Sequence, residues 1–346
     1  MNLSNASKLR FNGSDVKMVK FNGDIVYGGK TESNVIARYT SSASGVLPIF
    51  DDYFTDYDVV EVDNHDGTWT TTITRNGDIR PTIINFVNQL KLLSVDELDT
   101  SEVTDMSYMF NGCINMTYIN TSSFDTSKVI FMYQTFGSCY GLTSLDLSSF
   151  DTSQVTTMYS MFYACRSLTS LDLSGFDTSL VTDMSYMFSD CPELRSLNVK
   201  GWDTARVVDM SYMFANYNSW GGCPNLTSII GIEDWDTSSA SIMRYMFQSC
   251  RSLTSLDLSS FDTSKVTTLA YMFSGCDELT SLNSMKNISA DLTLPAYIDE
   301  ESVLDVVDNL ASVSSRKTLS MSTTQLSWIS DERIQIANDK GWTISA

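Results

Sequence analysis

Apolar and polar positions repeat along this chain between residues 83 and 283, with a period of about 26 residues. The unit LTSLDLSGFDTSLVTDMSYMFSDC, residues 168–191, recurs there with small changes. The cysteine at its end recurs at a constant spacing in Cys113, Cys139, Cys165 and Cys191. After an insertion it recurs in three further copies, at Cys223, Cys250 and Cys276. A fixed period of this length is typical of a solenoid, in which each coil buries its apolar side against its neighbours.

The pattern inside one unit predicts the elements of a coil. SLDL alternates apolar and polar residues, which predicts a short strand with one inward face, and VTDM predicts a second, shorter row of strands. MSYMFSDC spaces Met184, Met187, Phe188 and Cys191 at steps of three, one and three, which is helical periodicity and predicts a short helix or a 3₁₀ turn. The FDTS segment between the strands is typical of a corner. We therefore expect an α/β solenoid of leucine-rich-repeat-like coils, with parallel strands and short helical turns.

Large apolar residues occupy equivalent positions in the coils and predict internal ladders. Each large side chain contributes about 1.5–3 kcal/mol when it is buried. One ladder consists of Phe110, Phe136, Phe162, Phe188, Phe214, Phe247 and Phe273. Another consists of Leu98, Phe124, Phe150, Phe176, Trp202, Trp235 and Phe261. One period counted back from the first full coil predicts a degenerate end coil, with Ile83, Ile84 and Val87 at the Met, Phe and Cys positions.

The N-terminal segment, residues 1–30, differs from the rest in charge. It carries a formal +3 in a chain of net charge −20, so the remaining residues carry −23. FNG occurs twice in it, and the Asn-Gly pair at 22–23 predicts a β-hairpin. The segment is too small to hold a core alone. It is either a β-cap on the chain or an attachment module, anchored through Lys17, Lys20, Phe21, Asn22 and Gly23.

Three further domains follow this N-terminal segment. Residues 31–82 are predicted to form a β-rich domain, and residues 83–283 form the repeat solenoid. Residues 284–346 predict an α/β cap, because the apolar pattern changes character after Leu282. In this cap we expect helices over residues 299–310 and 331–339, and strands over residues 292–294, 317–321 and 342–344.

Two repeated rows carry side chains that could bind a metal ion or form disulfides. One row is Asp99, Asp125, Asp151, Asp177, Asp203, Asp236 and Asp262, each followed by Thr. Stacked about 4.8 Å apart, such carboxylates could hold calcium; we favour hydrogen bonds from the local backbone of a corner to the aspartates. The other row holds the seven cysteines. Neighbours lie within disulfide reach, but the odd number and the shared inward position favour free, buried thiols.

Candidate binding residues lie where the copies differ. A tyrosine row, interrupted by Gln134 and Ser160, runs through Tyr108, Tyr186, Tyr212, Tyr245 and Tyr271. The chain also gains six residues between Phe214 and Cys223. Insertions in a solenoid map to a loop on one face, and aromatic residues are common in binding surfaces. The candidate ligand contacts are therefore Tyr217, Trp220, Tyr212 and Tyr245; a neutral loop and a packing role for the tyrosines are the alternatives.

Composition argues against several classes of function. The single histidine, His65, lies outside the repeats, so the usual nucleophilic triads lack their base. The cysteines have no metal-ligand spacing, and the carboxylates repeat as columns rather than forming one singular pair. We expect no enzyme, no cofactor and no resident metal. An acidic chain is a poor nucleic-acid binder, and no apolar run is long enough for membrane insertion.

The repeat LTSLDLSxFDTSxVTxMxxMFxxC resembles the BspA-type leucine-rich repeats of bacterial surface proteins. The ending KTLSMSTTQLSWISDERIQIANDKGWTIS resembles a segment found beside such repeats in bacteriophage and gut-bacterial proteins, and KMVKFNGDIVYGGK resembles the openings of phage virion proteins. The resemblance implies an adhesin that binds host proteins, glycans or other cells.

These features together predict a non-enzymatic virion protein of a tail fibre, head fibre or decoration. It would contact other virion proteins through its N-terminal region and present the solenoid to a host surface protein or glycan. The alternatives are a bacterial cell-surface adhesin, for which no export signal is visible, and a purely structural decoration protein. The ligand and the oligomeric state are left open.

Overall fold

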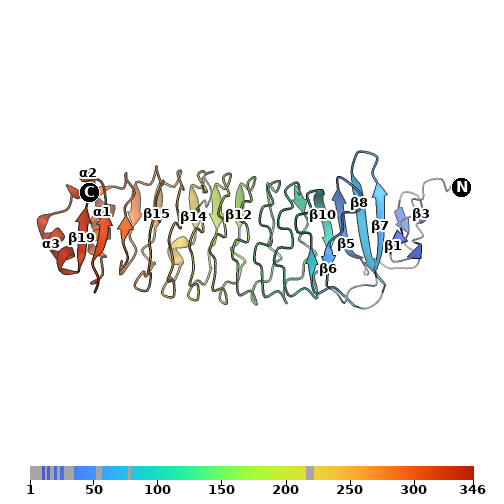
Figure 1. Ribbon diagram of the computed structural model, residues 1–346, viewed down its shortest axis with the longest axis horizontal. Coiled ribbons are helices and arrows are strands. Elements are labelled where there is room, and N and C mark those ends of the chain that lie inside the picture. Colours follow the sequence, from blue (N-terminus) through green and yellow to red (C-terminus); the bar gives the residue numbers. More distant parts are fainter. Residues whose placement is uncertain are drawn as a thin grey trace.

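The computed structural model describes residues 35–51, 57–76, 79–215 and 222–346, together with the backbone of four short strands before residue 27. The chain forms an elongated rod in which successive coils lie side by side along the long axis (Figure 1). The two N-terminal hairpins lie at one end of the rod, and strand β19 (Trp342–Ser345) lies at the other. The fold is a β-solenoid.

The SLDL segments form parallel strands, as the alternation predicts. β12 (Ser170–Asp172) pairs with β13 (Ser196–Asn198), which pairs with β14 (Ser228–Ile230). β15 (Ser255–Asp257) pairs in the same way with β16 (Ser281–Asn283). Equivalent residues of successive copies lie opposite one another in each pair, and the central residue of each strand is buried while its neighbours face outward. The sequence period is therefore the structural period of the rod.

The VTDM segments form a second line of parallel contacts. Single parallel bridges join Asp105 to Phe131, Phe131 to Thr157, and so on through Thr268. This row is shorter than the first, as predicted, because each coil contributes only one bridged residue. Two lines of backbone pairing per coil fix the stacking of the coils along the rod.

MSYMFSDC forms turns closed by backbone bonds three residues apart, such as Met187 N–H to the Met184 carbonyl (3.3 Å), and not a helix. The predicted α/β class of the coils is therefore wrong. Among the described coil residues the structure has one 3₁₀ helix, η2 (Ile232–Asp234). In the copy at residues 184–191, alternate N–H groups donate to the next coil, Met184 to Asp209 (3.1 Å) and Tyr186 to Ser211 (3.0 Å). Tyr186 also has a φ of 58°, in the left-handed region. The N–H groups that a helix would need are thus used between coils.

The two aromatic ladders are confirmed. The seven phenylalanines of the first ladder are buried, and ring centroids of successive coils lie 5.5 to 6.0 Å apart with nearly parallel planes. In the second ladder, Trp202 stacks on Trp235 at 5.8 Å and Trp235 on Phe261 at 6.1 Å. These rings fill the interior of the rod along its length.

The register predicted for the end coil is wrong. Phe86, and not Ile84, continues the first ladder, and its ring stacks on Phe110 at 5.7 Å. The Phe86 carbonyl also accepts a hydrogen bond from the Cys113 thiol, as the ladder carbonyls do in later coils. Ile83 is exposed. Burying a large aromatic ring in the ladder stabilises the fold, whereas keeping the repeat spacing constant does not stabilise it by itself. Phe86 therefore takes the ladder position, although it breaks the spacing.

The region before the coils is antiparallel and joins the solenoid through one sheet. Its strands are β5 (Val35–Ser41), β7 (Tyr57–Asp63) and β8 (Trp69–Arg75). β5 pairs with β10 (Leu92–Leu98), and β10 pairs in parallel with β11 (Tyr118–Ile119), the first of the coil strands. A second, two-stranded sheet joins β6 (Ile49–Phe50) to β9 (Ile84–Asn85).

The N-terminal hairpin is confirmed. β3 (Val19–Phe21) pairs antiparallel with β4 (Asp24–Val26), with Phe21 opposite Asp24. A second small hairpin joins β1 (Arg10–Phe11) to β2 (Ser14–Asp15) at the earlier FNG sequence. Of the predicted anchoring residues, Lys20 and Phe21 lie on β3, and Lys17, Asn22 and Gly23 lie outside the described residues.

The C-terminal residues alternate parallel strands with helices. β17 (Leu292–Thr293), β18 (Lys317–Ser320) and β19 form one parallel sheet. Between them lie α1 (Glu300–Asp308), α2 (Thr323–Leu326) and α3 (Asp331–Asp339). Helix α1 begins after Asp299, whose carboxylate accepts the Ser302 N–H at 2.8 Å and satisfies a free donor of the first turn.

Candidate functional site

The aspartate row shapes the corners, as we favoured from the sequence. In each of the seven copies the Oδ1 atom accepts the backbone N–H of the residue two positions later, at 2.9 to 3.1 Å. In Asp125 and Asp177, hydrogen bonds from the neighbouring serine side chains, together with these backbone bonds, hold the pKa below its usual range. Within the described residues, no cluster of three His, Cys, Asp or Glu side chains is arranged to hold a metal ion.

A threonine row, which sequence reasoning did not single out, follows the aspartates and joins the coils. Each hydroxyl is donated to a main-chain carbonyl of the next coil, at 2.8 to 3.0 Å. For example, the buried Thr178 donates to the carbonyl of Asp203. The sequence contained a signal for this row, because a Thr follows each Asp of the aspartate row. The row is therefore part of the scaffold.

The cysteine row packs the interior, as its inward position predicts. All seven thiols are free and buried, and each lies within hydrogen-bonding distance of the Phe carbonyl of the preceding coil, at 3.1 to 3.7 Å. Burial raises the pKa of Cys165 and Cys223 to about 12, and the pKa of Cys191 rises well above its usual range. These thiols stay protonated at neutral pH, so they serve as packing groups rather than nucleophiles.

The tyrosine row forms a continuous column on one side of the rod. Tyr212 stacks on Tyr245 with ring centroids 4.6 Å apart, and neighbouring steps at the C-terminal end are 4.7 and 4.9 Å. Tyr212 and Tyr245 are half-buried, so the structure brings these two candidate residues together. The other two candidates, Tyr217 and Trp220, lie outside the described residues.

Each position of the row has a backbone conformation in the left-handed region. The φ angles are 57° to 60° at the five tyrosines, 49° at Gln134 and 52° at Ser160. Side chains other than glycine, asparagine and aspartate adopt this region rarely. The hydrogen bonds on both sides of each turn hold the residue there, and the five tyrosine side chains lie half-buried or exposed at equivalent places in their coils.

Two tyrosines that the sequence row leaves out complete the column. Tyr133 and Tyr159 stand one residue before the interruptions at Gln134 and Ser160. Their rings stack at 4.8 Å, and Tyr133 lies 4.7 Å from Tyr108. Hydrogen bonding to Tyr108 and burial raise the pKa of Tyr133 to about 12. An alignment of the copies that allows a shift of one residue would have found these two tyrosines, because each lies directly before an interruption of the row.

A pocket opens where the column changes position. The step from Tyr159 to Tyr186 is wider, 5.7 Å, and its rings are tilted by 55°. A cavity of about 370 Å³ lies at this step, lined by Gln134, Tyr159, Ser160, Tyr163 and Tyr186. Aromatic walls with a few polar groups are typical of pockets for small ligands.

A charged pair borders this pocket. The Arg166 guanidinium binds the buried Asp190 carboxylate at 2.8 Å and lies over the Tyr140 ring, 4.5 Å from its centroid. Burial and the nearby Asp190 raise the pKa of Tyr163. The arginine charge is thus compensated within the protein.

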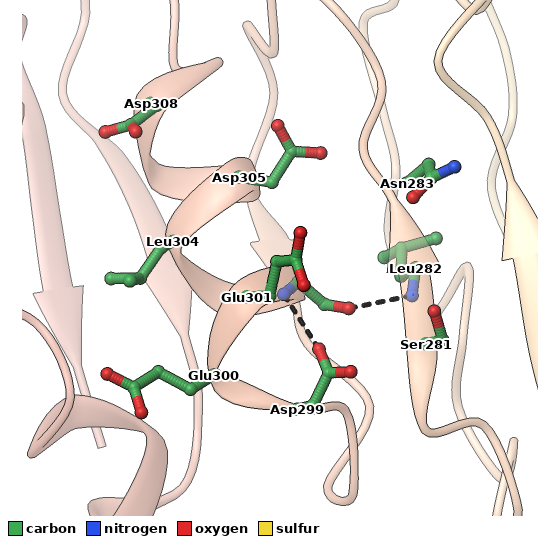
Figure 2. Close-up of a pocket in the computed structure, with 10 residues that line it drawn as sticks. Ser281, Leu282, Asn283, Asp299, Glu300, Glu301, Leu304, Asp305 and Asp308 are labelled. Atoms are coloured by element: carbon green, nitrogen blue, oxygen red, sulfur yellow. Dashed lines mark hydrogen bonds between the residues drawn. The ribbon is translucent and has the colours of Figure 1, made fainter.

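A larger groove of about 820 Å³ lies between β16 and helix α1 (Figure 2). It is lined by five carboxylates, but several have structural partners. Asp299 begins the helix, Asp305 accepts the Ser284 N–H at 2.7 Å, and Asp308 pairs with Arg333 at 3.1 Å. The Leu282 N–H donates to the Ser302 hydroxyl at 2.8 Å, which ties the helix to the strand. Asp299, Asp305 and Asp308 therefore hold α1 in place.

The chain matches one known family of repeat proteins. A family model described as "Mycoplasma protein of unknown function, DUF285" matches residues 82–195, 144–225 and 196–296, which overlap and together span more than half of the chain. No curated protein matches it. The matched residues include the tyrosine column and its pocket. In the described part of the chain, no helix is long and apolar enough to cross a membrane.

Proposed function

The chain belongs to the DUF285 family of BspA-like repeat proteins, and from this membership, together with the resemblance of KMVKFNGDIVYGGK to the openings of phage virion proteins, we propose that it is a non-enzymatic adhesion protein of a bacteriophage virion. In this proposal the solenoid is a rigid arm of a fibre or decoration. One side of the arm presents a binding surface to a host protein or glycan, and the N-terminal region docks on other virion proteins.

The observation that carries the proposal is that some repeated residues form the hydrogen bonds of the scaffold, whereas others lie on its surface. The aspartate, threonine and cysteine rows form hydrogen bonds within or between coils, so their chemistry serves the scaffold. The rings of the tyrosine column are half-buried or exposed along one side of the rod, so they are accessible to a partner. A scaffold of constant coils with an accessible row of aromatic side chains supports presentation of a surface. The proposal assigns no catalytic step, cofactor or resident metal.

Charge and local structure support docking through the N-terminal region. Residues 1–30 carry +3 beside a remainder of −23. The strands described there form two small hairpins, and none of these strands pairs with a solenoid sheet. In the proposal, Lys17, Lys20, Phe21, Asn22 and Gly23 contact an acidic partner surface.

The location is tested by fractionating a culture that produces the protein. An antibody against the solenoid is used to probe purified virus particles and, separately, peptides released from intact cells by surface proteolysis. Detection in particles supports the virion proposal, and detection only on cells supports the alternative of a bacterial surface adhesin. Absence from both fractions refutes both placements.

The docking proposal is tested by charge reversal. The double variant Lys17→Glu, Lys20→Glu is expected to lose incorporation into particles while its melting temperature stays unchanged. A matched control reverses two lysines of the solenoid, Lys128→Glu with Lys265→Glu. Normal incorporation of the N-terminal variant would refute docking through these residues. Particles that carry the protein but gain no adhesion to host cells would instead leave the second alternative, a purely structural decoration.

A further inference from the structure

The strongest unassigned feature of the molecule is the pocket in the tyrosine column. Elsewhere toward the C-terminal end the column is closed, with rings 4.6 to 4.9 Å apart and tilted by 9° to 18°. Between Tyr159 and Tyr186 the rings diverge to 55°. The smaller residue at the left-handed position, Ser160, leaves the space that a tyrosine fills in most other coils. The pocket is thus a consequence of two sequence differences, at Gln134 and Ser160.

Two polar side chains line the pocket beside the aromatic rings. Ser160 lines the cavity although the residue as a whole is 2% exposed. The Gln134 side-chain oxygen accepts from Asn111 at 2.9 Å, so its amide nitrogen remains as a donor toward the pocket. The hydroxyl and amide groups of a ligand can take the place of water as hydrogen-bond partners of these two side chains.

The aromatic walls complete the recognition surface. The Tyr159 and Tyr186 rings are half-buried, and both line the cavity. The electron-rich face of an aromatic ring attracts polarised hydrogens, and the axial C–H groups of a sugar ring present such hydrogens. The lining residues come from three successive coils, so the pocket spans about 10 Å of the rod.

We propose that this pocket binds one ring of a neutral glycan, with its C–H face on Tyr159 or Tyr186 and its hydroxyl groups on Ser160 and Gln134. The inference rests on the proposed adhesion function and names the class of ligand. A neutral sugar is favoured because the chain carries a net charge of −20, and because Asp190 neutralises the neighbouring Arg166 at 2.8 Å. A pocket confined to three coils suits a sugar ring better than an extended peptide.

The other copies of the repeat suggest a variant that closes the pocket and uses only residue types that occur at the equivalent positions. Other copies carry Ser followed by Tyr at these positions, as in Ser185-Tyr186 and Ser211-Tyr212. The exchange variant Tyr159→Ser with Ser160→Tyr reproduces that order and keeps the composition unchanged. The backbone accepts it, because Tyr186 and Tyr212 have φ angles of 58° and 57°, close to the 52° of Ser160.

The probes are methyl glycosides of glucose, galactose, mannose and N-acetylglucosamine, titrated into the full chain by saturation-transfer NMR. We expect the native chain to bind at least one of them with a Kd of about 1 mM. The exchange variant should bind it at least tenfold more weakly, and Ser160→Ala several-fold more weakly, with unchanged melting temperatures. Tyr118→Ser is the matched control, since Tyr118 is 55% exposed and lies outside the column.

Three results would overturn the pocket proposal. They are no binding of any glycoside to the native chain, equal binding by the exchange variant, and binding of a proline-rich peptide in place of the sugars. If the native chain adheres to cells but binds no glycoside, the pocket proposal fails and the proposed function stands. If the chain binds a glycoside in the pocket but is absent from particles and cell surfaces, the proposed function fails and the pocket remains.

Discussion

Truncation of one ladder ring, Phe188→Ala, tests the physical basis of the rod. Phe188 is fully buried, and its ring stacks 5.6 Å from both Phe162 and Phe214. Loss of a buried phenylalanine side chain usually destabilises a protein by about 3–5 kcal/mol. Two stacked neighbours, each contributing about 0.5–1.5 kcal/mol beyond burial, place the expected loss in the upper half of that range.

The assay is urea unfolding followed by circular dichroism, with hydrogen exchange to resolve individual coils. A solenoid is stabilised by contacts between nearest neighbours. The variant should therefore lose amide protection first in the coils that contain Phe162, Phe188 and Phe214. Phe188→Leu keeps most of the apolar area and should lie between the variant and the native chain. Tyr118→Ala, at an exposed position, should change stability by less than about 0.5 kcal/mol. A similarly small effect of Phe188→Ala would refute the ladder as the source of stability.

Three further predictions concern the scaffold rows. Thr178→Val leaves the Asp203 carbonyl without its 2.8 Å donor and should reduce the free energy of unfolding by about 1–3 kcal/mol. The exposed Thr169→Val should have little effect, and equal effects of the two changes in urea titrations would contradict the threonine row. The pKa of Cys165 is about 12 in the folded chain and about 8.5 when the chain is unfolded. The free energy of unfolding should therefore fall as the pH rises from about 8.5 to about 12, by up to about 1.4 kcal/mol per pH unit per thiol. Cys165→Ala should reduce that slope. A calcium chelator should leave the melting temperature unchanged, because each aspartate Oδ1 of the row accepts a corner N–H; a lowered melting temperature would revive the calcium hypothesis.

The sequence predicts those features that each copy contains in itself. The period, the inward Phe row and the SLDL strands follow from which positions stay apolar in every coil. The role of Asp177 follows similarly, because its acceptor geometry depends on residues only two positions away. Local patterning is sufficient for these elements, and the structure agrees with them.

Features that depend on contacts between coils were beyond such reasoning. The steps of Met184, Met187 and Phe188 fit a helix, but the Met184 N–H donates to the next coil and the backbone turns left-handed at Tyr186. Likewise, Phe86 belongs to the ladder because of what it stacks on, and not because of its distance along the chain. The pocket was missed for the same reason, since Tyr159 joins the column only in space.

The direction of the hydrogen bonds between coils has a mechanical consequence. These bonds run along the rod, so a pull on its two ends loads every junction between coils in series. The junction at β12 and β13 combines three paired residues on each strand with one bridge at Asp183 and the Thr178 hydrogen bond. Such junctions can separate in succession. Each released coil of about 26 residues would add up to roughly 90 Å of slack chain. A tether built in this way would lengthen in steps and limit the force on whatever it holds.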